Sequence, residues 1–79
     1  MTRRDMILEI LAEASGRPLD QVGDLFTAML EANLISHNGL DEKFTESQAR
    51  QMLDEFRGEL PGIRRWLMEE GLLEKSGHA

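Results

Sequence analysis

The most distinctive stretch of this sequence is ELPGIRRWLMEEGLLEKSG, residues 59–77. It contains the only tryptophan and one of the two prolines of the chain. Proline fits the first turn of a helix and glycine often ends one, so Pro61 and Gly71 delimit a short helix. Its apolar residues recur with helical spacing, at Ile63, Trp66 and Leu67. We expect the rest of the chain to pack around this apolar face.

A first helix is predicted over about residues 3–15. Thr2 and Asp5 resemble a capping box, in which a hydroxyl accepts from a free N–H group of the first turn. Gly16 ends this helix because glycine adopts the left-handed conformation at little cost. The apolar residues that share one helical face are Met6, Ile7, Ile10, Leu11 and Ala14.

A second helix is predicted to start at Pro18 and to end near Asn33. Its apolar residues are Val22, Leu25, Phe26, Met29 and Leu30. Gly23 leaves two alternatives open, because glycine weakens a helix interior. It either permits close packing within one helix or separates two shorter helices.

The segment SHNGLDEK, residues 36–43, is a polar loop with an Asn-Gly turn. A third helix then starts at Thr45, where Gln48 completes a capping box, and it ends at Gly58. Its predicted buried stripe consists of Ala49, Met52, Leu53 and Phe56.

Residues 29–35 (MLEANLI) and 67–73 (LMEEGLL) resemble each other. Each reads as a helix end with an acid, a capping residue and an apolar pair. The similarity indicates either two stacked helix–turn–helix halves or simply two helices that end in the same way.

The length of 79 residues limits the chain to a single domain, residues 1–79. The expected fold is all-α, a compact domain of four helices. The sequence has no cysteine, which excludes disulfides and thiolate metal sites and fits a cytoplasmic protein. No apolar run approaches the ~20 residues that a membrane-spanning helix needs, so we expect no membrane partner.

Residues 44–77 resemble the second half of small bacterial winged-helix domains, a helix–turn–helix family found alone or appended to transcription regulators. The resemblance rests on an aromatic and Thr-Glu start, a helix that ends in an aromatic residue, and a helix followed by G-L-L-E. The matching residues are Phe44, Thr45, Glu46, Phe56, Ile63, Arg64, Arg65, Leu67, Gly71, Leu72, Leu73, Glu74 and Lys75. It implies a DNA-binding role, with the arginines on a recognition helix. Because the sequence ends four residues after Lys75, we expect a truncated unit without a full wing.

The predicted binding surface is the face of the last helix opposite Trp66, and we expect Trp66 itself to belong to the core. Arg64, Arg65 and Met68 share that opposite face, and Arg57 and Lys75 extend it. Adjacent arginines are able to contact phosphate, and arginine and methionine are also enriched in protein interfaces.

Charge favours a protein partner, whereas the resemblance favours DNA. Fifteen acidic against nine basic residues give a net charge of −6, which repels phosphates at long range and disfavours nucleic acid. We find no nucleophile–base pair, phosphate-binding glycine loop or metal-ligand spacing, so we expect no enzyme activity, cofactor or metal. The expected function is a small protein-interaction module, an adaptor or a homodimer. A helix–turn–helix DNA-binding protein or regulator component is the alternative.

Overall fold

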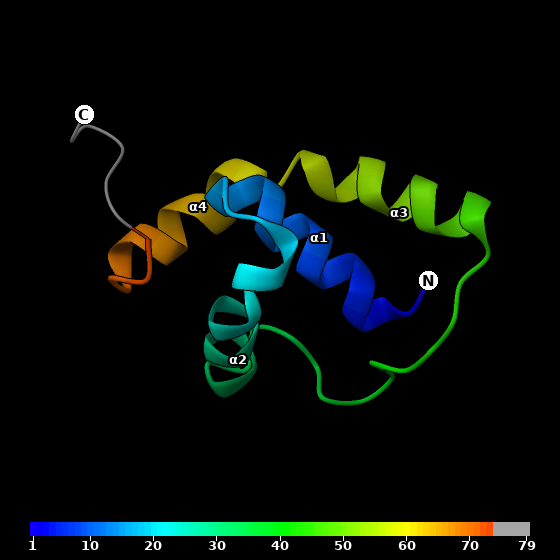
Figure 1. Cartoon of the computed structure of the whole chain (residues 1–79), viewed down its shortest axis with the longest axis horizontal. Helices are drawn as coiled ribbons and strands as arrows, with labels where there is room; N and C mark the ends of the chain where they lie inside the picture. Colours follow the sequence, from blue (N-terminus) through cyan, green and yellow to red (C-terminus); the bar gives the residue numbers. More distant parts are fainter. Residues whose placement is uncertain (74–79) are drawn as a thin grey trace.

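The computed structural model of this protein describes residues 1–73, which form an all-helical fold (Figure 1). Four α-helices and one short 3₁₀ helix follow in chain order. They are α1 (Arg3–Ser15), η1 (Leu19–Gln21), α2 (Gly23–Glu31), α3 (Glu46–Arg57) and α4 (Leu60–Glu69). The described residues contain no β-strand, and an isolated bridge joins Thr2 to Lys43. The predicted all-α class is therefore confirmed.

The helix at the centre of the fold is α1. It makes the principal contacts with α4, α2, α3 and η1, whereas those elements have few contacts with one another. In Figure 1, α3 runs along one side of α1, α2 lies on another, and α4 starts near the C-terminal end of α1. The expectation that the chain packs around the 60–69 helix was thus wrong, because the apolar faces of the other helices meet on α1 and not on α4.

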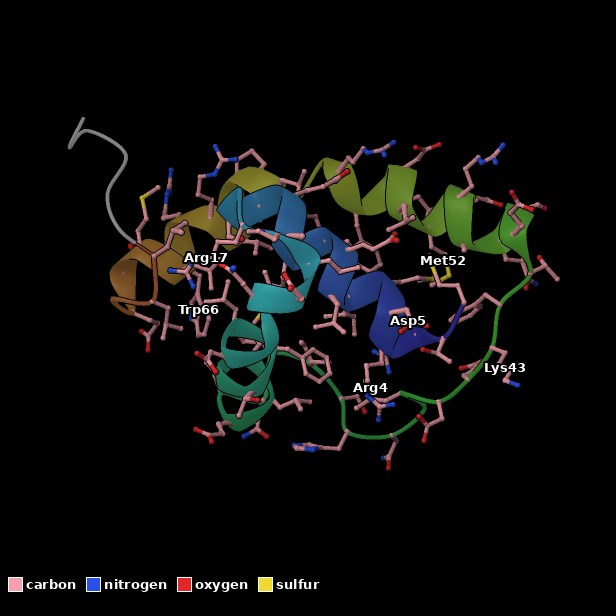
Figure 2. The ribbon with its side chains drawn as sticks, in the orientation of Figure 1. Arg4, Asp5, Arg17, Lys43, Met52 and Trp66 are labelled. Carbon is pink, nitrogen blue, oxygen red and sulfur yellow. The ribbon has the colours of Figure 1, made fainter. Side chains whose placement is uncertain are left out.

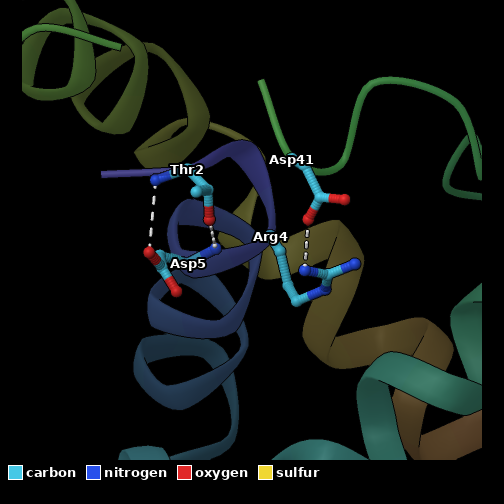
Figure 3. A network of polar contacts seen from close by, with 4 residues as sticks. All are labelled: Thr2, Arg4, Asp5 and Asp41. Atoms are coloured by element: carbon cyan, nitrogen blue, oxygen red, sulfur yellow. Dashed lines mark hydrogen bonds and ion pairs between the residues drawn. The ribbon is translucent and has the colours of Figure 1, made fainter. Parts of the chain in front are cut away.

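Both ends of α1 are capped as the sequence predicts. The N–H group of Asp5 donates to the Thr2 hydroxyl (3.2 Å), and the N–H group of Thr2 donates to the Asp5 carboxylate (3.2 Å) (Figure 3). At the other end, Gly16 is left-handed, with φ of 73°, and its N–H group donates to the Ala12 carbonyl (2.9 Å). Local sequence therefore fixes the length of α1.

A distant segment completes the N-terminal cap. The N–H group of Arg3 donates to the Glu42 carbonyl (2.9 Å), and that of Arg4 donates to the Leu40 carbonyl (3.0 Å). These are free N–H groups of the first helical turn, which need partners outside the helix. The Arg4 guanidinium also donates to the Asp41 carboxylate (2.6 Å), as Figure 3 shows. The predicted loop 36–43 is thus held against α1.

The chain around Gly23 follows the second of the two alternatives. Residues 19–21 form η1, Val22 links the two helices, and α2 begins at Gly23. Val22 is fully buried, so the break in the helix turns an apolar side chain into the core.

The two segments with similar sequence end alike. Asn33 and Gly71 are both left-handed. The next residue in each case, Leu34 or Leu72, donates its N–H group to a carbonyl five positions earlier. The similarity of residues 29–35 and 67–73 therefore reflects a shared way of ending a helix.

The core is small and lies between α1, the start of α2 and α4. One buried cluster there consists of Leu11, Val22, Leu25 and Leu67. The other buried apolar residues are Met6, Ile10, Ala14, Ile35, Leu40 and Ala49. Among the residues of α3 only Ala49 is buried, and the other members of the predicted stripe are half-buried, namely Met52, Leu53 and Phe56. Trp66 and Ile63 of α4 are also half-buried and pack against the core from its edge. The predicted inward faces of α3 and α4 are therefore buried only at Ala49 and Leu67, and their other apolar residues are half-buried.

Leu67→Ala is predicted to lower the free energy of unfolding by about 2–5 kcal/mol, because it leaves a cavity in a core with few members. Chemical denaturation followed by Trp66 fluorescence measures the effect. Leu34→Ala is the matched control, since the Leu34 side chain is 52% exposed and its loss should change stability by no more than about 0.5 kcal/mol. Equal effects of the two substitutions would contradict the assignment of the core.

The capping box predicts a pH dependence of stability. Hydrogen bonds from the Thr2 N–H group, and then from the Thr2 side chain, lower the pKa of Asp5 below its usual value. A carboxyl group whose pKa is lower in the folded state stabilises the protein above its unfolded pKa, and this contribution is lost as pH falls through the folded pKa. The stability advantage of the wild type over Asp5→Asn is therefore expected in full at neutral pH. It should decline as the pH falls below about 4 and vanish once the pH is below the lower pKa of the folded state. Urea denaturation from pH 7 to pH 2 checks this, and an advantage that persisted in acid would contradict it.

Candidate binding surface on α4

The candidate site lies on the outer face of α4, where the structure forms a pocket of about 350 Å³. We call it the basic pocket. Its lining consists of Leu60, Pro61, Arg64, Arg65 and Met68. It therefore brings together three of the five predicted binding residues, and it adds Leu60 and Pro61, which the sequence analysis had treated only as the helix start.

Helical geometry explains why these side chains gather on one face. Residues three and four positions apart are neighbours on a helix. Arg64 and Arg65 therefore lie one turn after Leu60 and Pro61, and Met68 lies one turn after the arginines on the same face. Leu67, by contrast, is fully buried in the core. Burial of that residue fixes the rotation of α4, and with it the direction in which the two arginines point.

The two arginines differ in their surroundings. The Arg64 Nε group donates to the Ala14 carbonyl of α1 (2.9 Å), so part of this guanidinium satisfies a carbonyl at the C-terminal end of α1. Arg65 is exposed and makes no hydrogen bond or ion pair with another residue of the described chain. Arg64 therefore has a structural role, and Arg65 is available to an external group.

Arg57 belongs to a different pocket, of about 370 Å³, between α3 and the N-terminus. The guanidinium of Arg57 pairs with Asp54 (2.5 Å) and with Glu13 of α1 (3.6 Å). Arg50 is likewise paired, with Glu46 (3.3 Å). These arginines hold intramolecular partners and leave little uncompensated charge. The residues that line this pocket are Met1, Glu46, Ala49, Arg50, Leu53, Asp54 and Arg57.

Two further predictions concern Lys75 and Trp66. Lys75, like the predicted frayed end at residues 76–79, lies outside the described residues. Trp66 was assigned to the core, yet it is half-buried and lines a separate pocket between α2 and α4 (Figure 2). Sequence spacing alone did not indicate this pocket, because its other wall comes from α2.

Comparison with protein-family models, with curated proteins and with solved structures finds no match for this chain. The winged-helix resemblance therefore remains an interpretation of residues 44–77. In residues 1–73 no helix has the length and apolar character needed to cross a membrane.

The difference between the two arginines predicts different effects on stability. Arg64→Ala removes a charged hydrogen-bond donor from the Ala14 carbonyl. It should lower the free energy of unfolding by about 1 kcal/mol, a small loss for a charged hydrogen bond because the site is only partly buried. Arg65→Ala should change it by no more than about 0.5 kcal/mol. Denaturant titration of both variants checks this, and a larger loss for Arg65→Ala than for Arg64→Ala would contradict it.

Proposed function

We propose that this protein is a small non-catalytic protein-interaction module that docks a partner protein on the basic pocket of α4. The observation that carries the proposal is one of charge. In a chain with a net charge of −6, this pocket is lined by two arginines and three apolar residues, with no acidic residue among them.

The composition of the pocket supports a protein partner. Arginine and methionine are enriched at the centre of protein interfaces, where an apolar surround strengthens polar contacts by excluding water. Met68 is half-buried beside the arginines and supplies such a surround. The planar guanidinium of Arg65 is able to donate two parallel hydrogen bonds to one carboxylate of a partner.

A DNA-binding role is the second candidate, and the presence of both arginines on one helix favours it. DNA binding gains affinity from several phosphate contacts at once. Only Arg65 is wholly available among the described arginines of α3 and α4, because Arg64 donates to Ala14 and both Arg50 and Arg57 are paired with acids. The charge of the whole chain also opposes approach to phosphates. The protein-interaction function is therefore the better supported of the two.

Site-specific photocrosslinking tests the proposal. A photoreactive residue at Met68 keeps both arginines in place and is expected to give a covalent protein adduct in cells that produce the chain. Adding Arg65→Glu should remove the adduct, because it places a carboxylate opposite the carboxylate of the partner. Arg50→Glu makes the same change of charge on α3 and should leave the adduct intact. A photoreactive residue at Leu34 is the positional control.

The absence of a protein adduct at Met68, or an adduct that Arg65→Glu leaves unchanged, would overturn the proposal. Titration of labelled duplex DNA separates the second candidate. No binding is expected at low salt, whereas binding that weakens steeply with salt and is lost in Arg65→Ala would favour the DNA-binding role.

A further inference from the structure

A further pocket, of about 300 Å³, lies on the side of α4 that faces α2. We call it the acidic pocket. Its lining consists of Ala28, Glu31, Ala32, Trp66, Glu70 and Leu72. Glu31 belongs to α2 and Glu70 follows the last turn of α4, and the indole of Trp66 lies between the two helices in Figure 2. The pocket thus combines an aromatic ring with two negative charges.

Neither carboxylate forms an ion pair within the described chain. Arg17 reaches the same end of α4, but its guanidinium donates to the Leu72 carbonyl (3.1 Å) rather than to a glutamate. The acidic pocket is therefore complementary to a guanidinium, which can pair with carboxylates and stack on an aromatic ring.

The basic and acidic pockets carry opposite charge. Among the described residues, the lining of the first includes two arginines and no acid, and the lining of the second includes two glutamates and no base. Both also carry apolar groups, including Met68 in the first and Trp66 in the second. Every copy of the chain presents both surfaces, so two copies offer each other a complementary contact.

We infer that the protein docked on the basic pocket is a second copy of this chain, with Arg65 of one copy bound between Glu31, Glu70 and Trp66 of the other. This inference rests on the proposed function and names the partner. Because the two pockets are different surfaces, the contact closes into a dimer only if a twofold axis relates the copies, and otherwise it extends into longer oligomers.

The contact is local and weak. Two copies that each carry a net charge of −6 repel each other at long range, and this repulsion offsets part of the attraction between the pockets. Added salt weakens both terms at once, so salt dependence does not discriminate. Reversal of a single charge does distinguish the two terms. It changes the contact between the pockets and leaves most of the long-range repulsion between the two chains in place.

Sedimentation equilibrium of the purified 79-residue chain is expected to show dimers or longer oligomers. Concentrations up to about 1 mM are needed because small interfaces associate weakly. Dilution should shift the fluorescence of Trp66, since the only tryptophan lines the acidic pocket. Arg65→Glu and Glu70→Arg should each weaken the association by at least about tenfold, because each brings like charges together.

A mixture of the Arg65→Glu and Glu70→Arg variants tests whether these two residues contact each other between chains. The carboxylate introduced by Arg65→Glu in one chain then faces the guanidinium introduced by Glu70→Arg in the other. The second contact between the same two chains keeps its original arginine and glutamate. The mixture should therefore associate more tightly than either variant alone, but less tightly than the wild type because the introduced carboxylate also faces Glu31. Arg50→Glu is the matched control and should associate as the wild type does. Circular dichroism verifies that every variant is folded, which is expected because Arg65 and Glu70 are both exposed.

A wild-type chain that stays monomeric at every concentration would overturn the inference. So would an association that neither reversal weakens, or a mixture that associates no more tightly than each variant alone. The photocrosslinking experiment distinguishes this failure from that of the proposed function. Suppose that the purified chain is monomeric and that the residue at position 68 forms a charge-dependent adduct with a different protein. This result would refute the inference that the partner is a second copy, and the proposed interaction function would stand.

Discussion

The capping of α1 by segments far from it in sequence is the interaction on which the fold depends. The N–H groups of its first turn donate to the carbonyls of Leu40 and Glu42, and the carbonyl of Ala14 near its last turn accepts from Arg64. Unpaired backbone groups at helix ends are costly when they leave water. Satisfying them holds the 36–44 segment at one end of α1 and α4 at the other. A chain of this length buries little apolar surface, so such polar contacts carry a large share of its conformational specificity.

The position of α4 follows from the same contacts. Its buried side places Leu67 in the core, and Arg64 joins it to α1. Two pockets of opposite charge flank the helix, one lined by Arg65 and the other by Glu70, which directly follows α4. A single short helix thus anchors the core and presents both of the surfaces to which we assign binding. The same small core leaves Trp66 half-buried, where it can serve both packing and recognition.

Part of the surface could be predicted from the sequence, because helical spacing is a local property. Arg64, Arg65 and Met68 share a face wherever the helix lies, and the structure does place them in one pocket. The separation of Arg57 from this group could not be predicted, since its partner Glu13 belongs to α1. Nor could the structural role of Arg64 be read from its position beside Arg65. Both distinctions depend on which residues of α1 lie across from each arginine.

The sequence by itself determined the helical class and most helix boundaries, through capping residues, glycines and apolar spacing that act within a few residues. Thr2, Gly16, Thr45 and Gly71 end or begin helices for reasons that are local to the backbone. The tertiary structure alone decided that α1 is the central helix, that α3 is buried on one side only, and that Glu31 and Glu70 line one pocket with Trp66. These features arise from contacts between residues distant in sequence, and helical periodicity does not specify which apolar face packs against which.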